Sequence, residues 1–325
     1  MNHMDVEAQI ISVSNRDEDN AFAKEVAEIN RCKYVKAPTA NELRMALKAS
    51  LFSVVLWDAD HKNTLEGSAP NSFQHIGQIL RQFSLPSRQV FVITDEPLNK
   101  TPYLFNYPAF DHHIYRRYDP PAAQLFGYLA KASLWTEVQF GLEGFVPPKT
   151  DIKKLVLKRS GERKPVIQAI ENILGQKGVP PKLCVVASQA IDELLMNAIF
   201  DAPVADDYEY RRHLERTKDF ELLEREKAEI EIAVSQEYIA LSVTDFFGSL
   251  KKEAGLAFIR KDYEVKELKV KEVESSGVGI YGIIKSGLSL LFLLRPGQTT
   301  QVVIFVPMVK NFKAFRSAVR FFSFF

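Results

Sequence analysis

The first 135 or so residues alternate short apolar segments with amphipathic stretches, and this pattern restricts the fold more than any other feature. Strands that alternate with helices in this way form a parallel sheet covered by helices. Functional side chains of such a sheet belong at the carboxyl ends of its strands, where Asp58, Thr94 and Arg116 are found. The five predicted strands are Gln9–Val13, Tyr34–Lys36, Ser53–Trp57, Gln89–Thr94 and His113–Arg117.

These strand-terminal residues resemble those of the response-regulator receiver domain, a flavodoxin-like fold with a five-stranded parallel sheet. In receivers the third strand ends in the aspartate that accepts a phosphoryl group, the fourth in Thr or Ser, and the fifth in Lys. Asp58 and Thr94 match the first two positions, whereas Arg116 replaces the lysine. The resemblance implies a receiver-like domain over residues 1–138 with Asp58 as a candidate phosphoacceptor. The other interpretation of Asp58 is an aspartate that caps the turn after its strand.

The acidic pair that binds Mg²⁺ in receivers is replaced in this chain. Its positions after the first strand fall on Ser14 and Asn15, although Asp17 and Glu18 follow closely. Because Mg²⁺ relies on hard anionic oxygen ligands, we expect a divalent ion to bind poorly here. A pseudo-receiver that docks a partner is therefore the preferred interpretation. Three aromatic residues are candidate docking anchors or, alternatively, core residues: Tyr115, Tyr118 and Phe126.

A helical pattern in the second half of the chain carries two polar side chains on one stripe. Within residues 186–202, Glu193 and Asn197 are four positions apart, so both point the same way. A carboxylate and an amide placed like this can bind a hydrated Mg²⁺ and direct a water or hydroxyl toward a phosphate. Taken alone, an exposed helix edge is the commoner explanation.

Two later segments carry groups suited to a nucleotide. Asp245 ends an alternating strand and runs into a turn that contains Gly248. A carboxylate there can accept a hydrogen bond from an amine such as that of adenine, and a glycine lets the backbone approach a ligand; an Asx-type turn is the alternative. Further on, Gly277 and Gly279 precede an apolar helical run, which presents free N–H groups to phosphates.

In this order the three segments resemble the N, G1 and G2 boxes of the GHKL superfamily, the Bergerat-fold ATP-binding domains of histidine kinases, gyrase and anti-sigma-factor kinases. The resemblance covers roughly residues 150–308 and is nearest to the anti-sigma serine-kinase branch, because a strand and one helix precede the first box. It implies an α/β-sandwich domain over residues 152–308. Its strands are expected at Ile152–Arg159, Ile230–Val234, Tyr238–Thr244, Leu290–Leu294 and Val302–Val306.

The resemblance also implies roles for individual residues. Glu193 would be the general base or orient a water, Asn197 would coordinate Mg²⁺, and Asp245 would read the adenine amino group of ATP. The remaining nucleotide-binding positions would be Gly248, Gly277, Gly279 and Thr300.

Three positions depart from the family pattern. Asp201 stands where a basic residue or His is usual, and Phe247 and Ser249 replace residues of the Asp-x-Gly-x-Gly sequence of the G1 box, the first glycine becoming aromatic. Binding of ATP and Mg²⁺ is therefore a better expectation than turnover.

Composition is compatible with two ordinary globular domains. The chain has 325 residues, 46% hydrophobic and 26% charged, and a net charge of +1 that gives no reason to expect nucleic acid. Only Cys32 and Cys184 occur, which excludes a disulfide framework and fits a cytoplasmic protein. The longest apolar run, around Leu288–Leu294, is short of the roughly 20 residues that span a bilayer.

Three further segments receive specific predictions. Residues 139–151, with two glycines and two prolines, are expected to form a linker, and residues 204–229 an inserted amphipathic helix beside the nucleotide site. Residues 309–325 are rich in Phe and are expected to form an aromatic helix or tail. This tail would pack on the chain's own domain, mediate a homodimer contact or meet a membrane surface.

Two functions from different classes follow from these observations. One is a signal-transduction protein that binds ATP–Mg²⁺ and acts on a protein partner; its specific form would be an anti-sigma-type protein-serine kinase regulated by the receiver-like domain. The other is a non-catalytic regulatory scaffold in which both domains serve as protein-docking modules.

Overall fold

A computed structural model describes residues 8–60, 69–95, 110–119, 122–134, 137, 139–203, 214–256, 280, 282–283, 286–309, 314–315 and 320–325. The chain divides into two compact units. Unit 1 comprises Met1–Glu137 with Val319–Ser323 and Phe325, and unit 2 comprises Val138–Ala318 with Phe324. The division after Glu137 lies one residue from the domain boundary expected from the sequence.

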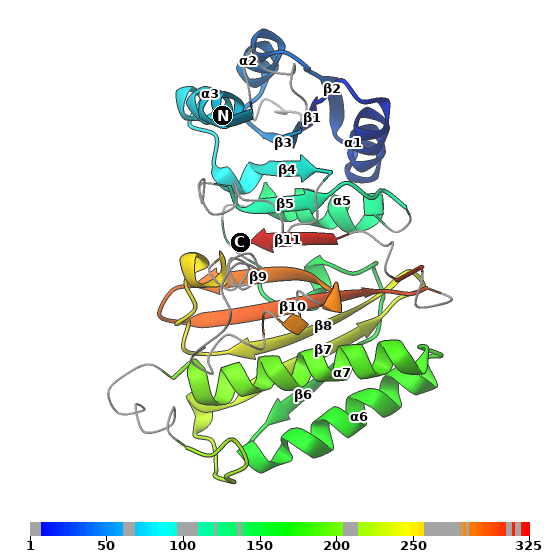
Figure 1. Cartoon of the computed structure of the whole chain (residues 1–325), viewed down its shortest axis with the longest axis vertical. Coiled ribbons are helices and arrows are strands. Elements are labelled where there is room, and N and C mark those ends of the chain that lie inside the picture. Colours follow the sequence, from blue (N-terminus) through cyan, green and yellow to red (C-terminus); the bar gives the residue numbers. More distant parts are fainter. Residues whose placement is uncertain are drawn as a thin grey trace, which may run out of the picture. The chain divides into compact units, whose positions relative to one another are not determined.

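Unit 1 contains all five strands that the sequence predicts, and they form the parallel sheet expected of an α/β fold (Figure 1). The strand order is β2-β1-β3-β4-β5, and each neighbouring pair is parallel. The strands are β1 (Gln9–Val13), β2 (Lys33–Lys36), β3 (Ser53–Asp58), β4 (Val90–Thr94) and β5 (His112–Tyr115).

Helices cover both faces of this sheet because its strands are apolar on both sides. Alternate strand residues such as Val55 and Trp57 belong to one core cluster with residues of α2 (Ala40–Ala49) and α3 (Ala69–Gln82). On the other face α1 (Asp17–Asn30) packs against α5 (Ala122–Ser133). The predicted docking anchor Phe126 belongs to this core, since only 1% of it is exposed.

The last residues of the aromatic C-terminal segment form a sixth strand of unit 1, which the expectation of a helix or tail over residues 309–325 did not include, whereas residues 314–315 are helical. Strand β11 (Arg320–Phe324) pairs antiparallel with β5, with Phe321 opposite Ile114 and Phe322 opposite His113. Both phenylalanines are buried. Pairing with the free edge of β5 thus determines the conformation of this segment, and these aromatic side chains are buried by the chain itself.

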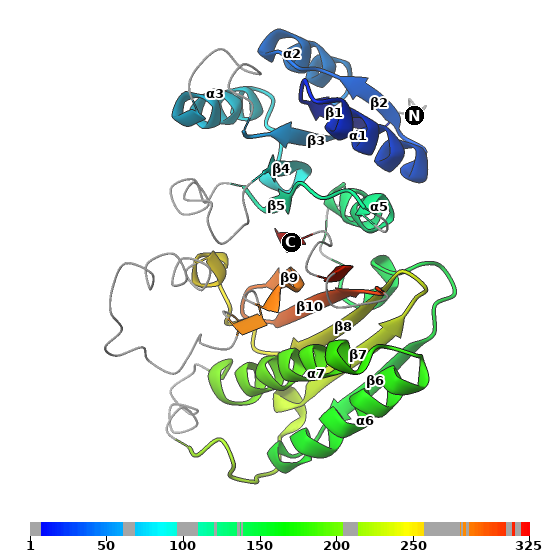
Figure 2. The ribbon, with the colours of Figure 1, turned by 45° about the vertical axis from the view of Figure 1, so that its right-hand side comes forward.

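Unit 2 is built on an antiparallel sheet with helices on one face (Figure 2). The order β9-β10-β8-β7-β6 has antiparallel pairing throughout. Two helices, α6 (Arg163–Gln176) and α7 (Pro181–Met196), cover this face. The strands are β6 (Ile152–Leu157), β7 (Ala228–Val234), β8 (Tyr238–Asp245), β9 (Ser289–Arg295) and β10 (Thr299–Pro307).

The segment predicted as a linker is an integral part of unit 2. Its backbone N–H groups at Gly141 and Leu142 donate to Gln301 Oε1 (2.7 Å) and Glu231 Oε2 (2.9 Å). The Tyr238 hydroxyl donates to the carbonyl oxygen of Phe145 at 2.7 Å. Glycines and prolines correctly indicated irregular backbone, but buried polar partners on the sheet fix it in place.

The inserted helix expected over residues 204–229 is not formed in its described part. Residues 214–227 are turns and irregular chain with a single 3₁₀ turn, Glu224–Glu226, and β7 then begins at Ala228. Ser160 Oγ donates to the carbonyl oxygen of Lys218 at 2.9 Å, and the Phe220 N–H donates to Ser160 Oγ at 2.9 Å. These tertiary contacts override the amphipathic pattern.

One stretch of the described chain, Pro181–Asp201, is long and apolar enough by composition to span a bilayer. The sequence analysis did not single it out. It is α7 and its continuation, and 61% of its most apolar window is buried inside the protein. A core helix passes the same test, so the observation is weak support for a membrane span.

Candidate functional site

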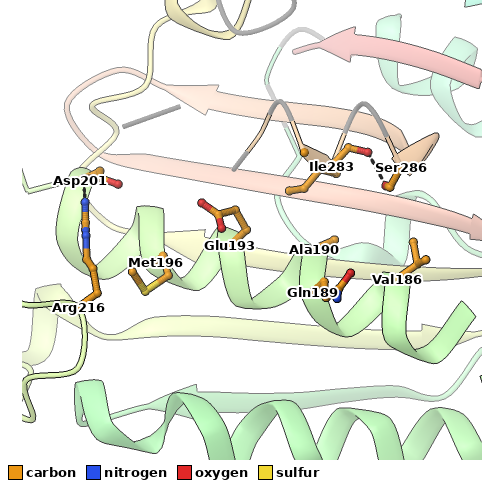
Figure 3. Close-up of a pocket in the computed structure, with 10 residues that line it drawn as sticks. Val186, Gln189, Ala190, Glu193, Met196, Asp201, Arg216, Ile283 and Ser286 are labelled. Carbon is orange, nitrogen blue, oxygen red and sulfur yellow. Dashed lines mark hydrogen bonds and ion pairs between the residues drawn. The ribbon is translucent and has the colours of Figure 1, made fainter. Parts of the chain in front are cut away.

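A cavity of about 460 Å³ lies beside α7 in unit 2 (Figure 3). One wall is α7, which begins with Pro181 at its first position, where the missing N–H costs no hydrogen bond. The opposite wall comes from Ile283 and Ser286, and Gly282 also lines the cavity. The remaining lining residues are Val186, Gln189, Ala190, Glu193, Met196, Asp201 and Arg216.

Glu193 is the predicted site residue that lines this cavity. Its half-buried carboxylate points away from the α7 axis into the space below Ile283 (Figure 3). Burial raises the pKa of Glu193, and the charges of Asp192 and Asp201 act in the same direction. A carboxylate with a raised pKa is a better proton acceptor at neutral pH than an exposed one.

Asn197 follows one turn later and begins a short π-helix, Asn197–Asp201. Such π segments often occur at functional sites. Its Nδ2 atom is buried and has no hydrogen-bond partner among the described residues. Asn197 is not among the residues that line the cavity. The structure therefore brings Glu193 to the cavity wall and leaves an unsatisfied amide behind it.

Asp245 and Thr300 lie opposite each other on paired strands. The register of β8 and β10 places Thr300 across from Asp245. Asp245 Oδ1 accepts hydrogen bonds from the N–H groups of Phe247 (2.9 Å) and Gly248 (3.2 Å). The Asx-type turn considered from the sequence is thus present, and because both backbone bonds use Oδ1, Oδ2 keeps acceptor capacity.

Burial raises the pKa of Asp245 to about 6. The two backbone hydrogen bonds and the Thr300 hydroxyl act in the opposite direction but do not compensate for the lost hydration. Strand side chains alternate, so Asp245 shares its face of the sheet with Val243 and Leu241. The other face carries Glu231 and Gln301, which accept hydrogen bonds from the segment that was predicted as a linker, residues 139–151. Asp245 therefore belongs to the face that the helices cover.

Gly248 permits a close approach, but to the protein's own backbone. Its φ is +59°, and an added Cβ would lie 2.4 Å from the carbonyl oxygen of Arg295 and 2.4 Å from the nitrogen of Gln298. The Gly297 N–H donates to the Gly248 carbonyl at 2.9 Å. The β9–β10 turn alone thus requires glycine here. The neighbouring Phe247 is buried, with the Arg225 guanidinium 5.1 Å from its ring centroid.

Two predicted phosphate-binding glycines, Gly277 and Gly279, lie outside the described residues. The structure instead reveals a cation that the sequence analysis missed. Arg216 Nη2 lies 2.8 Å from Asp201 Oδ1, and both residues line the cavity (Figure 3). The Arg216 guanidinium also lies 4.9 Å from the Phe200 ring centroid. Asp201 stands where the GHKL pattern has a basic residue or His, and its carboxylate binds the basic side chain of Arg216.

In unit 1, Asp58 is buried at the carboxyl end of β3 and is paired with Arg116. Arg116 Nη2 lies 2.5 Å from Asp58 Oδ1, and its Nε lies 2.8 Å from Asp19 Oδ1. Its Nη1 pairs with Asp95. Burial alone lowers the pKa of Arg116, but the hydrogen bond and charge of Asp19, followed by Asp58 and Asp95, raise it overall.

Asp19 is the acidic residue that the sequence analysis missed. It lies in the first turn of α1, beyond the Asp17 and Glu18 that were considered, and it is only 1% exposed. Tyr118, a predicted docking anchor, donates its hydroxyl to Asp19 Oδ1 at 2.6 Å and stacks on Phe22 with ring centroids 4.1 Å apart. A buried acidic side chain is therefore present at this end of the sheet, although the positions of the acidic pair are Ser14 and Asn15. The poor binding of a divalent ion stays a prediction.

Among the residues that the structure describes, no group of three or more His, Cys, Asp or Glu side chains is arranged to hold a metal ion. In unit 1 the reason is visible: the Arg116 guanidinium lies between the carboxylates. In unit 2 the carboxylate of Glu193 lines the cavity, and the amide of Asn197 follows four residues later without lining it.

Comparison with known proteins leaves the family open. No family model matches the chain, and no curated protein matches it. Among solved structures, a chain of the SiaB–SiaC complex from Pseudomonas aeruginosa is similar at a TM-score of 0.28 and 11% sequence identity, over 47% of this chain and 88% of that chain. A likeness at this level defines neither fold nor function.

Proposed function

We propose that unit 2 is a Bergerat-fold domain of the GHKL type that binds ATP with Mg²⁺, and that the chain is a signalling protein. The observation that carries the proposal is Glu193 on the wall of a cavity of about 460 Å³, a volume within the range of small-molecule sites. The antiparallel sheet with α6 and α7 on one face supports it.

The chain supplies a group for each part of the nucleotide. Asp245 would accept the adenine amino group on Oδ2, which its turn leaves available. Arg216 at the cavity wall would meet the phosphates. Asn197 would hold Mg²⁺ through Oδ1, and Mg²⁺ offsets phosphate charge when bound. Its Nδ2, buried and without a partner among the described residues, would donate to an acceptor oxygen of the ligand. The glycine positions and Thr300 keep the roles that the family resemblance implies.

Glu193 would act on the hydroxyl of a protein partner in the manner of an anti-sigma-type serine kinase. Its raised pKa supports a role as proton acceptor, and its position on α7 fixes it relative to the cavity. We expect Glu193→Gln to retain nucleotide binding and to lose phosphoryl transfer, because the amide keeps the shape of the side chain and not its basicity.

Unit 1 would be a flavodoxin-like pseudo-receiver that docks a protein. Its parallel order β2-β1-β3-β4-β5 and the positions of Asp58, Thr94 and Arg116 near the carboxyl ends of their strands support this. A regulatory scaffold without catalysis is the second candidate function for the whole chain. Phe247, buried in the turn where the family has a glycine, favours that alternative.

A thermal-shift titration with Mg-ATP separates the two functions. A ligand present at 100 times its dissociation constant adds about 2.7 kcal/mol to stability, so binding gives a clear rise in the melting temperature. We expect Asn197→Ala and Arg216→Ala to reduce this rise and Glu171→Gln, an exposed residue of α6, to leave it unchanged. A wild-type chain that gives no rise with Mg-ATP would refute ATP binding and leave the scaffold.

A further inference from the structure

The two buried carboxylates of unit 1, Asp19 and Asp58, are held by donors from the protein, and Asp19 is saturated by them. Asp19 Oδ1 accepts from Arg116 Nε (2.8 Å) and from the Tyr118 hydroxyl (2.6 Å). Asp19 Oδ2 accepts from Arg116 Nη2 (3.2 Å) and from the Ser14 hydroxyl (2.7 Å). A carboxylate oxygen has about two lone-pair sites, so neither oxygen of Asp19 is left to coordinate a metal.

Asp58 is engaged mainly through Oδ1, because the single hydroxyl hydrogen of Ser14 serves the shorter bond to Asp19. Its Oδ1 accepts from Arg116 Nη2 (2.5 Å) and from the Asp60 N–H (3.1 Å). Its Oδ2 lies 3.4 Å from Arg16 Nε and 3.3 Å from Ser14 Oγ. The side chain is essentially fully buried. An attack on phosphorus would require an oxygen of Asp58 to leave its guanidinium partner, Arg116 at Oδ1 or Arg16 at Oδ2, within a buried site.

The outer carboxylates extend the arrangement. Asp95 pairs with both Arg116 and Arg16, and Asp60 lies 3.7 Å from Arg116 Nη1. The Thr94 hydroxyl donates to Asp60 Oδ1 at 3.2 Å. A guanidinium is planar and always charged, so it suits several carboxylates at once better than a lysine ammonium does.

We propose that the Arg116 guanidinium is a built-in replacement for a divalent cation between Asp19 and Asp58, so that unit 1 keeps one conformation without metal and without phosphorylation of Asp58. The site is thus blocked by an arginine rather than missing its ligands. Arg116 and Tyr118 also tie the turn after β5 to the start of α1. A partner that binds this end of the sheet would bind a surface whose conformation does not change when a phosphodonor is present.

The test uses the full chain without nucleotide, titrated with Mn²⁺ and followed by electron paramagnetic resonance. We expect the wild type to show no Mn²⁺ binding that depends on Asp58, and intact mass to show no phosphoryl adduct after incubation with acetyl phosphate and Mg²⁺. Arg116→Ala should improve Mn²⁺ affinity by about ten-fold or more, and Arg116→Ala with Asp58→Asn should lose that gain. Arg117→Ala, at the exposed neighbouring arginine, is the matched control and should behave as wild type.

Two results would overturn the proposal. The first is wild-type Mn²⁺ binding, or an acyl phosphate, that disappears in Asp58→Asn. The second is a folded Arg116→Ala variant, judged by circular dichroism, that gains no Mn²⁺ affinity. If Arg116→Ala does not fold, Arg116→Lys takes its place and is expected to gain Mn²⁺ affinity, because a lysine keeps the charge and cannot bridge Asp19 and Asp58 in the same way. A folded Arg116→Lys variant without that gain would overturn the proposal.

Discussion

Replacing Asp245 by Asn should stabilise unit 2 at neutral pH. The pKa of Asp245 rises from 3.8 to about 6 on folding because the carboxylate is buried. Each pKa unit corresponds to about 1.4 kcal/mol, so the ionised group costs up to about 3 kcal/mol in the folded state above pH 6. Asparagine keeps an oxygen for the N–H groups of Phe247 and Gly248 and carries no charge.

The sign of the pH dependence follows from the raised pKa. The folded state binds the Asp245 proton more tightly than the unfolded state does, so its contribution to stability is present below pH 3.8 and is lost as the pH rises through about 6. The advantage of Asp245→Asn should therefore be largest at pH 7 to 8 and vanish toward pH 4.

Urea denaturation read by hydrogen exchange in β8 would measure this difference in unit 2 alone. Glu229→Gln, at an exposed position of β7, is the control for loss of a carboxylate and should change little. A difference between Asp245→Asn and wild type that stays constant from pH 4 to 8, or a variant less stable than wild type at pH 7.5, would refute the reasoning.

Two further stability predictions concern backbone contacts in unit 2. Gly248→Ala should lower the free energy of unfolding by at least about 2 kcal/mol, because its left-handed conformation and the overlap with Arg295 and Gln298 act together. Gly297→Ala has φ +70° and open space around it, so it should lower this free energy by only about 1 kcal/mol in the same urea assay. Equal costs would contradict the role given to the β9–β10 turn. Tyr238→Phe should lower the free energy of unfolding by about 1 kcal/mol through loss of its bond to the Phe145 carbonyl, and calorimetry showing no change would exclude that bond as an anchor of the segment.

The strands were predictable because their patterns are local. Apolar runs such as Ser53–Asp58 lie between turn residues and are buried on both faces, which a single stretch of sequence reveals. The strand at Arg320–Phe324 was not predictable in this way. Its phenylalanines, separated by the single polar residue Ser323, fit a helix or a strand. The open edge of β5, about 200 residues earlier in the chain, decides between the two.

The candidate sites show the same limit. Glu193 was predicted as a site residue from its position on an apolar helix, and the structure places it at a cavity. Arg216 was missed because its partner Asp201 is fifteen residues away, a separation at which no local sequence pattern links the two. Asp19 was missed because acidic residues in the first turn of a helix usually interact with the helix dipole. Only the fold shows that Asp19 faces Arg116 instead.

The position of β11 has a consequence for how the protein is made. Unit 2 is encoded between β5 and the last strand of the sheet to which β5 belongs. At 5 to 20 residues per second, a ribosome needs roughly 10–40 s to travel from Tyr115 to Arg320. Throughout that interval nascent unit 1 carries an unpaired strand edge, a surface on which chaperones would act and where stalled or truncated chains would associate.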